Sequence, residues 1–270
     1  MNESTKTIGA GGNTTFEMVL KAAVSLPAVR IYRKPFLSKE LKKYCTPEQV
    51  EIALSYNPAY AGIPVETIRK IADSCINFET NKVSAISFAA GIPGGFAMAG
   101  TIPADIAQYL GHILRILQKL MYLYGWDELF DQDNELDDET TNFLTLFIGI
   151  MFGVNGAATT VTKLSTSAAV RASKQLANKP LTKYAVYNVV KQIAKVLGVQ
   201  MNKQIFAKGV SKVIPVIGGV ASGGLTYVTY RPCAKKLQKY LETLKWCDVN
   251  YYRNQSQSVI IINDKQEKQQ

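Results

Sequence analysis

Six polar side chains between residues 105 and 122 have the types and the spacing that could support chemistry. They follow one another at steps of three and four residues, which places them on one face of a helix. These residues, called here the polar stripe, are Asp105, Gln108, His112, Arg115, Lys119 and Tyr122. A carboxylate and an imidazole can act in general acid–base catalysis. A guanidinium and an ammonium group can bind a phosphate or a partner carboxylate.

The spacing of the polar stripe limits what it can do. Asp105 and His112 lie two helical turns apart, roughly 10 Å, which is too far for a direct acid–base pair. The chain also has no GxSxG, HExxH or Cys/His/Asn arrangement that would supply a nucleophile with a base. The pattern therefore favours a solvated helix face over a functional site, and it favours a protein without catalytic residues. A closed cavity around Asp105, His112 and Arg115 would support a membrane-surface hydrolase or a lipid-binding protein instead.

The elements that must position the stripe are long helices. Thr101 can cap a helix that has Pro103 in its first turn and ends at Gly125. Its apolar side is made of Ile106, Leu110, Ile113, Leu117, Leu120 and Tyr124. Before it, "TPEQVEIALSY" carries a capping box with Thr46 at the N-cap and Gln49 three residues later. A further helix is predicted from Val65 to the Gly91-Ile92-Pro93 break, because a residue that precedes proline disfavours helical geometry.

The segment "AAGIPGGFAMAGTIPAD", residues 89–105, is predicted to be a buried, bent connector between two helices. It has neither the GxGxxG nor the GxxxxGK[ST] spacing of a phosphate-binding loop, and it follows a helix instead of a strand. Glycines let helices approach closely, and a second set of them lies in the third apolar segment. The candidate packing glycines are Gly91, Gly94, Gly95, Gly100, Gly218, Gly219 and Gly223.

Three apolar segments, residues 83–104, 140–162 and 213–230, are long enough or nearly long enough to cross a bilayer. The first is interrupted by Gly-Ile-Pro-Gly-Gly, and such breaks need protein around them at membrane depth. We therefore expect an all-α fold, a compact bundle of long helices with Gly-rich central apolar segments and Pro/Gly-broken connectors. Spanning stays open for the second and third segments. One domain is predicted over residues 15–248, between a disordered N-terminus (1–14) and a polar C-terminal tail (249–270).

The net charge of +10 is unevenly distributed. Residues 163–245, called here the basic half, hold fifteen lysine and arginine residues against one acid, Glu242. Nearly all of these are lysines, which suit anionic lipid headgroups, whereas nucleic-acid binding usually relies on arginine. We expect an anionic membrane surface as partner and no nucleic acid. The candidate lipid contacts are Lys191, Lys195, Lys203, Lys208, Lys212, Lys235 and Lys236.

No metal or cofactor site is expected. Asp131, Asp133 and Glu135 have part of the spacing of a calcium loop, but Leu136 stands where that loop needs glycine. The four cysteines are widely spaced and indicate buried thiols in a reducing compartment. The first twenty residues lack the pattern of a secretory signal, so we expect the cytoplasmic side of a membrane, with a peripheral or monotopic attachment.

Three long stretches of this chain resemble the EcsC family of helical proteins. They are "FLSKELKKYC", "AISFAAGIPGGFAMAGTIPADIAQYLGHILRILQKLMYLYGW" and "FAKGVSKVIPVIGGVASGGLTYVTYRPCAKKL". The match covers most of residues 25–245 in the expected order. The family's name-giving member is encoded beside the two subunits of an ABC transporter linked to secretion. The resemblance thus implies a non-enzymatic accessory role beside a membrane transporter, and it transfers no catalytic residue.

Overall fold

The computed structural model describes residues 8–89, 104–130, 138–168, 192 and 222–254, and within these ranges it describes the side chains of residues 16–83, 107–130, 140–163, 192 and 230–254. In chain order the helices are α1 (Ile8–Val24), α2 (Arg33–Leu41), α3 (Pro47–Ser55), α4 (Val65–Ala89), α5 (Ala104–Leu123), α6 (Asp138–Phe152), α7 (Ala157–Ala168) and α10 (Ser222–Leu241). A short 3₁₀ helix, η2 (Lys245–Cys247), follows α10. The described residues contain no strand, so the predicted all-α class is confirmed.

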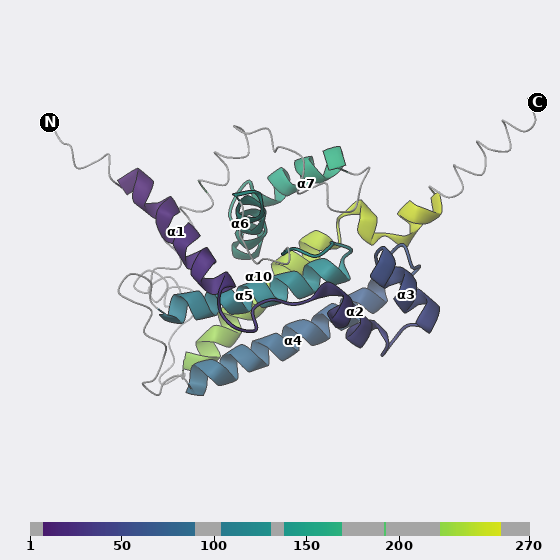
Figure 1. Ribbon diagram of the computed structural model, residues 1–270, viewed down its shortest axis with the longest axis horizontal. Coiled ribbons are helices and arrows are strands. Elements are labelled where there is room, and N and C mark those ends of the chain that lie inside the picture. Colours follow the sequence, from purple (N-terminus) through teal and green to yellow (C-terminus); the bar gives the residue numbers. More distant parts are fainter. Residues whose placement is uncertain (1–7, 90–103, 131–137, 169–191, 193–221, 255–270) are drawn as a thin grey trace, which may run out of the picture.

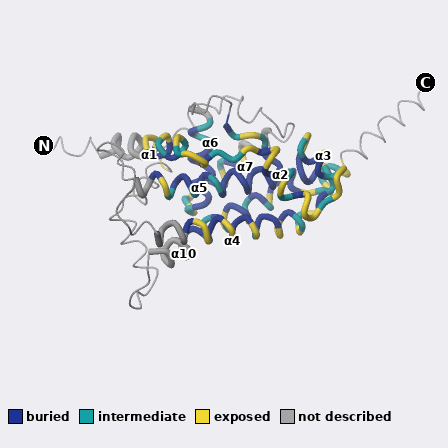
Figure 2. The backbone as a smooth tube through the Cα atoms, turned by 60° about the horizontal axis from the view of Figure 1, so that its bottom comes forward, coloured by how far each residue is buried: buried dark blue, intermediate teal, exposed yellow. Residues whose placement is uncertain are grey.

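Helix α5 is the centre of the bundle. It packs against α1, α2, α4, α6 and α10, and its residues are buried almost continuously from Leu110 to Tyr124. Figure 1 shows α5 lying between α4 and α6, and Figure 2 shows the buried positions running along it. The predicted apolar side is confirmed for Leu110, Ile113, Leu117, Leu120 and Tyr124, which are all buried. The side chain of Ile106 lies outside what the structure describes.

Helices α4 and α10 form the most extensive helix pair and run antiparallel. Polar contacts cross the pair in reverse order along the two chains: Arg69 meets Glu242, Asp73 meets Lys235 and Gln238, and Asn77 meets Arg231. Tyr124 of the α5 terminus also donates to Glu242, at 2.7 Å. This seam holds α10 and the residue that follows it against α4.

Glycines end two of the central helices. Gly125 has a φ of +91° after α5, and Gly153 has a φ of +71° after α6. In both turns the next residue's N–H reaches back five residues: Trp126 donates to Met121, and Val154 donates to Gly149. These are Schellman motifs, which require the left-handed backbone that glycine adopts without a steric penalty. The predicted stop of α5 at Gly125 is therefore confirmed.

The other predicted caps are confirmed where the structure describes them. Thr46 and Gln49 form the full capping box at the start of α3, with Gln49 N–H donating to Thr46 Oγ1 at 3.3 Å. Helix α4 begins at Val65 as predicted, and its last described residue is Ala89. The connector that contains Gly95, together with Thr101 and Pro103, lies outside the described residues.

The predicted limits of the domain differ at both ends. Helix α1 begins at Ile8, inside the segment expected to be disordered, because its buried residues Phe16 and Leu20 pack on the bundle. At the other end, residues 249–254 are helical. There the Tyr252 hydroxyl accepts a hydrogen bond from Asn57 Nδ2 at 2.8 Å. A tertiary contact therefore draws part of the polar tail into the fold.

The second apolar segment, residues 140–162, is two helices of 15 and 12 residues in place of one span. The break lies at Gly153 and Gly156, both with positive φ. The structure therefore does not have the single spanning helix that the sequence left open for this segment, and the preferred interpretation of bundle helices fits it. Part of the third segment falls outside the described residues, and the rest belongs to α10, which continues through Pro232. Among the residues described, no helix has both the length and the apolarity needed to cross a bilayer.

Candidate functional site

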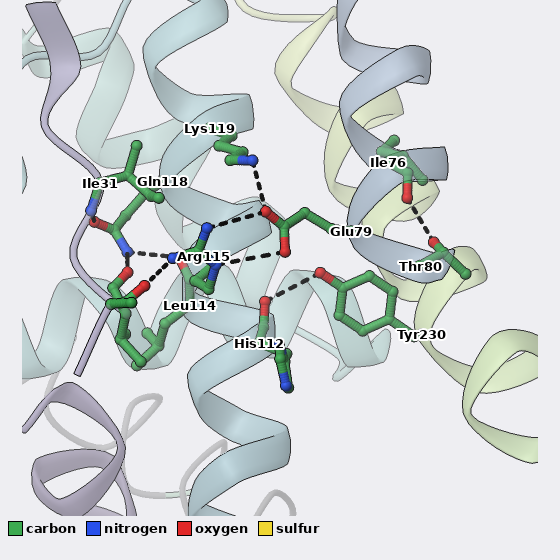
Figure 3. A network of polar contacts seen from close by, with 12 residues as sticks. Ile31, Ile76, Glu79, Thr80, His112, Leu114, Arg115, Gln118, Lys119 and Tyr230 are labelled. Atoms are coloured by element: carbon green, nitrogen blue, oxygen red, sulfur yellow. Dashed lines mark hydrogen bonds and ion pairs between the residues drawn. The ribbon is translucent and has the colours of Figure 1, made fainter. Parts of the chain in front are cut away.

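The candidate site is built on the side of α5 that faces α4 and the segment 28–32, which leads into α2. At its centre is Glu79 of α4, whose side chain has no solvent exposure. Lys119 Nζ lies 2.6 Å from Glu79 Oε1, and Arg115 approaches both carboxylate oxygens, at 3.3 and 3.4 Å. Figure 3 shows the carboxylate of Glu79 pointing from α4 toward these two cations. We call Glu79, Arg115 and Lys119 the buried triad.

The buried triad keeps Glu79 ionised. Burial alone raises the pKa of this carboxyl group, but the charges and hydrogen bonds of Lys119 and Arg115 outweigh burial and hold the pKa below its ordinary value. The cations are themselves largely covered, with side-chain exposures of 14% for Arg115 and 11% for Lys119. The cluster therefore carries two positive charges against one negative charge in a mostly dry environment.

Aromatic rings complete the surroundings of Lys119. Its ammonium group lies 5.7 Å from the ring centroid of Phe36 and 5.4 Å from that of Phe78. Cation–π attraction is stronger when the cation is partly removed from water. Phe36 belongs to α2 and Phe78 to α4, so this one lysine of α5 joins three helices.

Arg115 and Gln118 attach the extended segment 28–31 to α5. Arg115 donates to the carbonyl of Ala28, a residue with a φ of +62°. The amide of Gln118 acts like a peptide group: Oε1 accepts from Ile31 N–H at 2.8 Å, and Nε2 donates to Val29 O at 3.0 Å. Gln118 is fully buried, so these bonds satisfy backbone groups that water cannot reach.

Tyr122 anchors the start of α2 through Glu128. Its hydroxyl donates to Glu128 Oε1 at 3.0 Å, and Glu128 Oε2 accepts from the backbone N–H of Arg33 at 2.9 Å. The buried guanidinium of Arg33 then donates to the carbonyls of Ala53, Leu54, Tyr56 and Trp126. Three of these carbonyls lie at the C-terminal end of α3, where a positive charge is favourable.

His112 lies beside the triad without joining it. Its backbone carbonyl accepts from the hydroxyl of buried Tyr230 at 3.0 Å. Its imidazole points away from Glu79 in Figure 3. The Nδ1 atom is buried and has no hydrogen-bond partner among the described residues. Burial lowers the pKa of His112 and outweighs the opposite effect of Glu79, so the ring is neutral at pH 7.

The expectation that the polar stripe is a solvated face is wrong for most of its members. Gln108 is exposed as expected, but Lys119 and Tyr122 are buried and Arg115 is largely covered. The reason is that α5 is packed on every side, and its polar residues are matched by Glu79 and by the backbone of residues 28–31. Asp105 lies in α5, but its side chain falls outside what the structure describes.

Most of the candidate lipid contacts and packing glycines fall outside the described residues. This applies to Lys191, Lys195, Lys203, Lys208 and Lys212, and to Gly91, Gly94, Gly95, Gly100, Gly218 and Gly219. Gly223 lies in α10, with surroundings that are not described. Lys236 is exposed. Lys235 differs from expectation, because it forms an ion pair with Asp73 across the α4–α10 seam.

The described residues offer no activated thiol and no metal site. Burial raises the pKa of the Cys75 thiol to about 12 and that of Cys233 to about 11. Both thiols are therefore protonated at pH 7 and are poor nucleophiles. Within the described ranges, no cluster of three or more His, Cys, Asp or Glu residues could hold a metal ion. The buried triad joins α4 to α5 and carries a net charge of one positive unit at a fixed place.

The sequence did not predict Glu79, Gln118 or Arg33 as residues of the site. For Glu79 a signal was present: the apolar positions of α4 run through Ala72, Cys75 and Ile76 to Val83, and Glu79 falls in the same row. A single acid in an apolar row predicts a buried carboxylate with a cationic partner. Gln118 and Arg33 carry no such signal, because their partners are backbone groups distant in sequence.

Comparison with known proteins adds nothing to this geometry: no family model, no curated protein and no solved structure matches the chain. The resemblance to the EcsC family accordingly stays an expectation that rests on the residues quoted for it.

Proposed function

We propose that this chain is a non-enzymatic helical protein that binds the cytoplasmic surface of an anionic membrane, as a peripheral or monotopic protein. The observation that carries the proposal is the charge of residues 163–245, with fifteen lysine and arginine residues against one acid. Each lysine or arginine close to an anionic surface adds about 1 kcal/mol of attraction. The resemblance to the EcsC family further suggests an accessory role beside an ABC transporter or a secretion process.

The described part of the basic half supports the proposal in one respect. Lys236, Lys239 and Lys245 are exposed, so their charges are available at the surface. Lys235 is not, since it is held by Asp73. The acid of this half, Glu242, is bound by Arg69 and by Tyr124, which leaves the exposed lysines as the main charges of this part of the chain.

The polar stripe is a weaker basis for an enzymatic function. Arg115 is held by Glu79 and by the Ala28 carbonyl, and Lys119 is held by Glu79 between two rings. Both groups would have to leave these contacts before they could bind a substrate. The membrane-surface hydrolase or lipid-binding alternative therefore needs an observation that the described residues do not supply.

The test is co-sedimentation of the full chain with vesicles of phosphatidylcholine alone and of phosphatidylcholine with phosphatidylserine. We expect binding only to the mixed vesicles, and weaker binding as salt rises, because salt screens attraction between exposed charges. Lys239→Gln/Lys245→Gln should weaken binding, while the matched pair Lys21→Gln/Lys82→Gln, outside the basic half, should change it less. Equal binding to both vesicle types at high salt would refute an electrostatic attachment.

A further inference from the structure

Helix α2 has a sharply divided surface that lies outside the basic half. Arg33, Phe36, Leu37 and Leu41 are buried, and Glu40 is largely covered. At about 100° per residue, these positions fill one arc of the helix. Lys34, Lys39 and Lys42 span roughly 140° of the remaining arc of roughly 220°, and all three are exposed.

Exposed tyrosines flank the lysines at both ends of α2. Tyr32 directly precedes the helix and is 58% exposed, and Tyr44 follows it and is 43% exposed. Each ring has a cation over its face: Arg30 lies 4.8 Å from the centroid of Tyr32, and Lys70 lies 5.1 Å from that of Tyr44. Tyr32 and Tyr44 therefore place an exposed aromatic ring with a neighbouring cation at each end of α2.

The charge of this surface is one-sided. Between residues 30 and 46 the only acid is Glu40, and Lys43 pairs with it at 2.5 Å, which leaves Lys34, Lys39 and Lys42 without a neighbouring acid on α2. Glu128 is held at the start of α2 by the backbone N–H of Arg33, and the nearest acids in sequence, Glu48 and Glu51, belong to α3. We call Tyr32, Lys34, Lys39, Lys42 and Tyr44 the α2 face.

We propose that the α2 face is a second docking surface for anionic lipid headgroups, in addition to the basic half. The proposal rests on the proposed membrane association and names a described surface that takes part in it. Lysines supply attraction without the planar fork that reads bases or phosphates in nucleic acids. Tyrosine has an apolar ring and a polar tip, which suits the boundary between headgroups and acyl chains.

The α2 face lies far in the sequence from the basic half. Two basic surfaces of one chain that contact a membrane at the same time bind it more strongly than either alone, because the second contact is made at a high effective concentration. Loss of either surface should therefore weaken binding without abolishing it.

The experiment compares three double variants that each remove two exposed positive charges. They are Lys39→Gln/Lys42→Gln in the α2 face, Lys239→Gln/Lys245→Gln in the basic half, and Lys21→Gln/Lys82→Gln as the control. Binding of the full chain is measured by flotation with vesicles of phosphatidylcholine and phosphatidylserine. We expect the α2 variant to bind more weakly than the control by a factor of ten or more, from roughly fivefold per lysine. Tyr44→Ser should weaken binding in the same assay, and exposed Tyr56→Ser should not.

The outcomes separate the two proposals. If the α2 variant binds like the control while the basic-half variant binds more weakly, the α2 face is not a docking surface and the proposed function stands. If the unsubstituted chain does not bind the anionic vesicles, both proposals fail. If the α2 variant loses affinity for single-stranded RNA and keeps its affinity for vesicles, the surface binds nucleic acid and the inference is wrong. Circular dichroism melts establish that each variant is folded, and Lys34→Gln/Lys39→Gln replaces the first pair if that pair is not.

Discussion

Replacement of Glu79 by glutamine should destabilise this protein strongly. The substitution keeps the shape of the side chain and removes its charge, so Arg115 and Lys119 lose the carboxylate that compensates them. Removal of one partner from a buried ion pair typically costs about 3–5 kcal/mol. The two cations are 14% and 11% exposed and can turn partly toward water, so we expect the lower end, about 3 kcal/mol.

Urea unfolding at pH 7, followed by circular dichroism, measures this loss. In a chain of this size a loss of about 3 kcal/mol lowers the melting temperature by roughly 10 °C. Glu51→Gln is the matched control, because Glu51 is exposed on α3, and it should change stability by less than about 0.5 kcal/mol. Lys119→Met added to Glu79→Gln should restore part of the lost free energy of unfolding, because an uncharged side chain then lies between Phe36 and Phe78.

The pH dependence supplies a second measurement of the same contact. The folded pKa of Glu79 is below its ordinary value, so its contribution to stability is complete above the unfolded pKa, near 4.3. That contribution is lost as pH falls through the folded pKa. The difference between wild type and Glu79→Gln should therefore shrink on acidification below about pH 4. A Glu79→Gln variant as stable as Glu51→Gln at pH 7 would refute the buried triad and restore the interpretation of a solvated face.

Three further predictions concern caps, glycines and thiols. Thr46→Ala removes the capping box of α3 and should cost about 1 kcal/mol in urea unfolding. Gly125→Ala should lower the melting temperature more than Gly62→Ala. Both glycines have positive φ, so both substitutions strain the backbone. A Cβ at Gly125 would also lie 3.3 Å from Asn57 Cβ, whereas a Cβ at Gly62 would meet nothing within 4 Å. Equal decreases in melting temperature would show that backbone strain alone determines the loss of stability. Cys45, which is only partly buried, should be alkylated before Cys75, because burial raises the pKa of the Cys75 thiol to about 12. Mass spectrometry of partly alkylated native protein gives the order of labelling. Faster labelling of Cys75 would show that the structure around it opens.

Local signals in the sequence predict local structure well in this chain. Thr46, Pro47 and Gln49 mark the start of a helix through groups only three residues apart, and the structure has that capping box. Gly125 marks a helix end because a left-handed residue is needed there. Both features depend on the chemistry of neighbouring residues, which a single sequence displays directly.

The candidate site was harder to predict because its partners come from distant parts of the chain. The helix that ends at Gly125 has one apolar and one polar side in sequence, which normally indicates one buried and one solvated face. In the structure, Glu79 lies 36 residues before Arg115, and Ile31 lies 87 residues before Gln118. Polar residues of a central helix can be buried when such partners satisfy them. Periodicity alone cannot distinguish the two cases.

For the apolar segment 140–162, the sequence did not show whether there is one helix or two. It has no charge, and its length alone allows a spanning helix. The glycines at 153 and 156 adopt positive φ and divide it. Glycine is tolerated inside many apolar helices, so its presence in the sequence did not decide between a kink and a full break.

The central claim, attachment of the basic surfaces to anionic lipid, is tested most directly by hydrogen exchange of the full chain with and without vesicles. Mixed phosphatidylcholine–phosphatidylserine vesicles should slow exchange in the basic half and at residues 33–44, and phosphatidylcholine vesicles should not. The outer face of α4, with exposed Ser74 and Asn81, should exchange equally in all three conditions. Unchanged exchange in both basic surfaces, or equal protection by the two kinds of vesicle, would contradict the account.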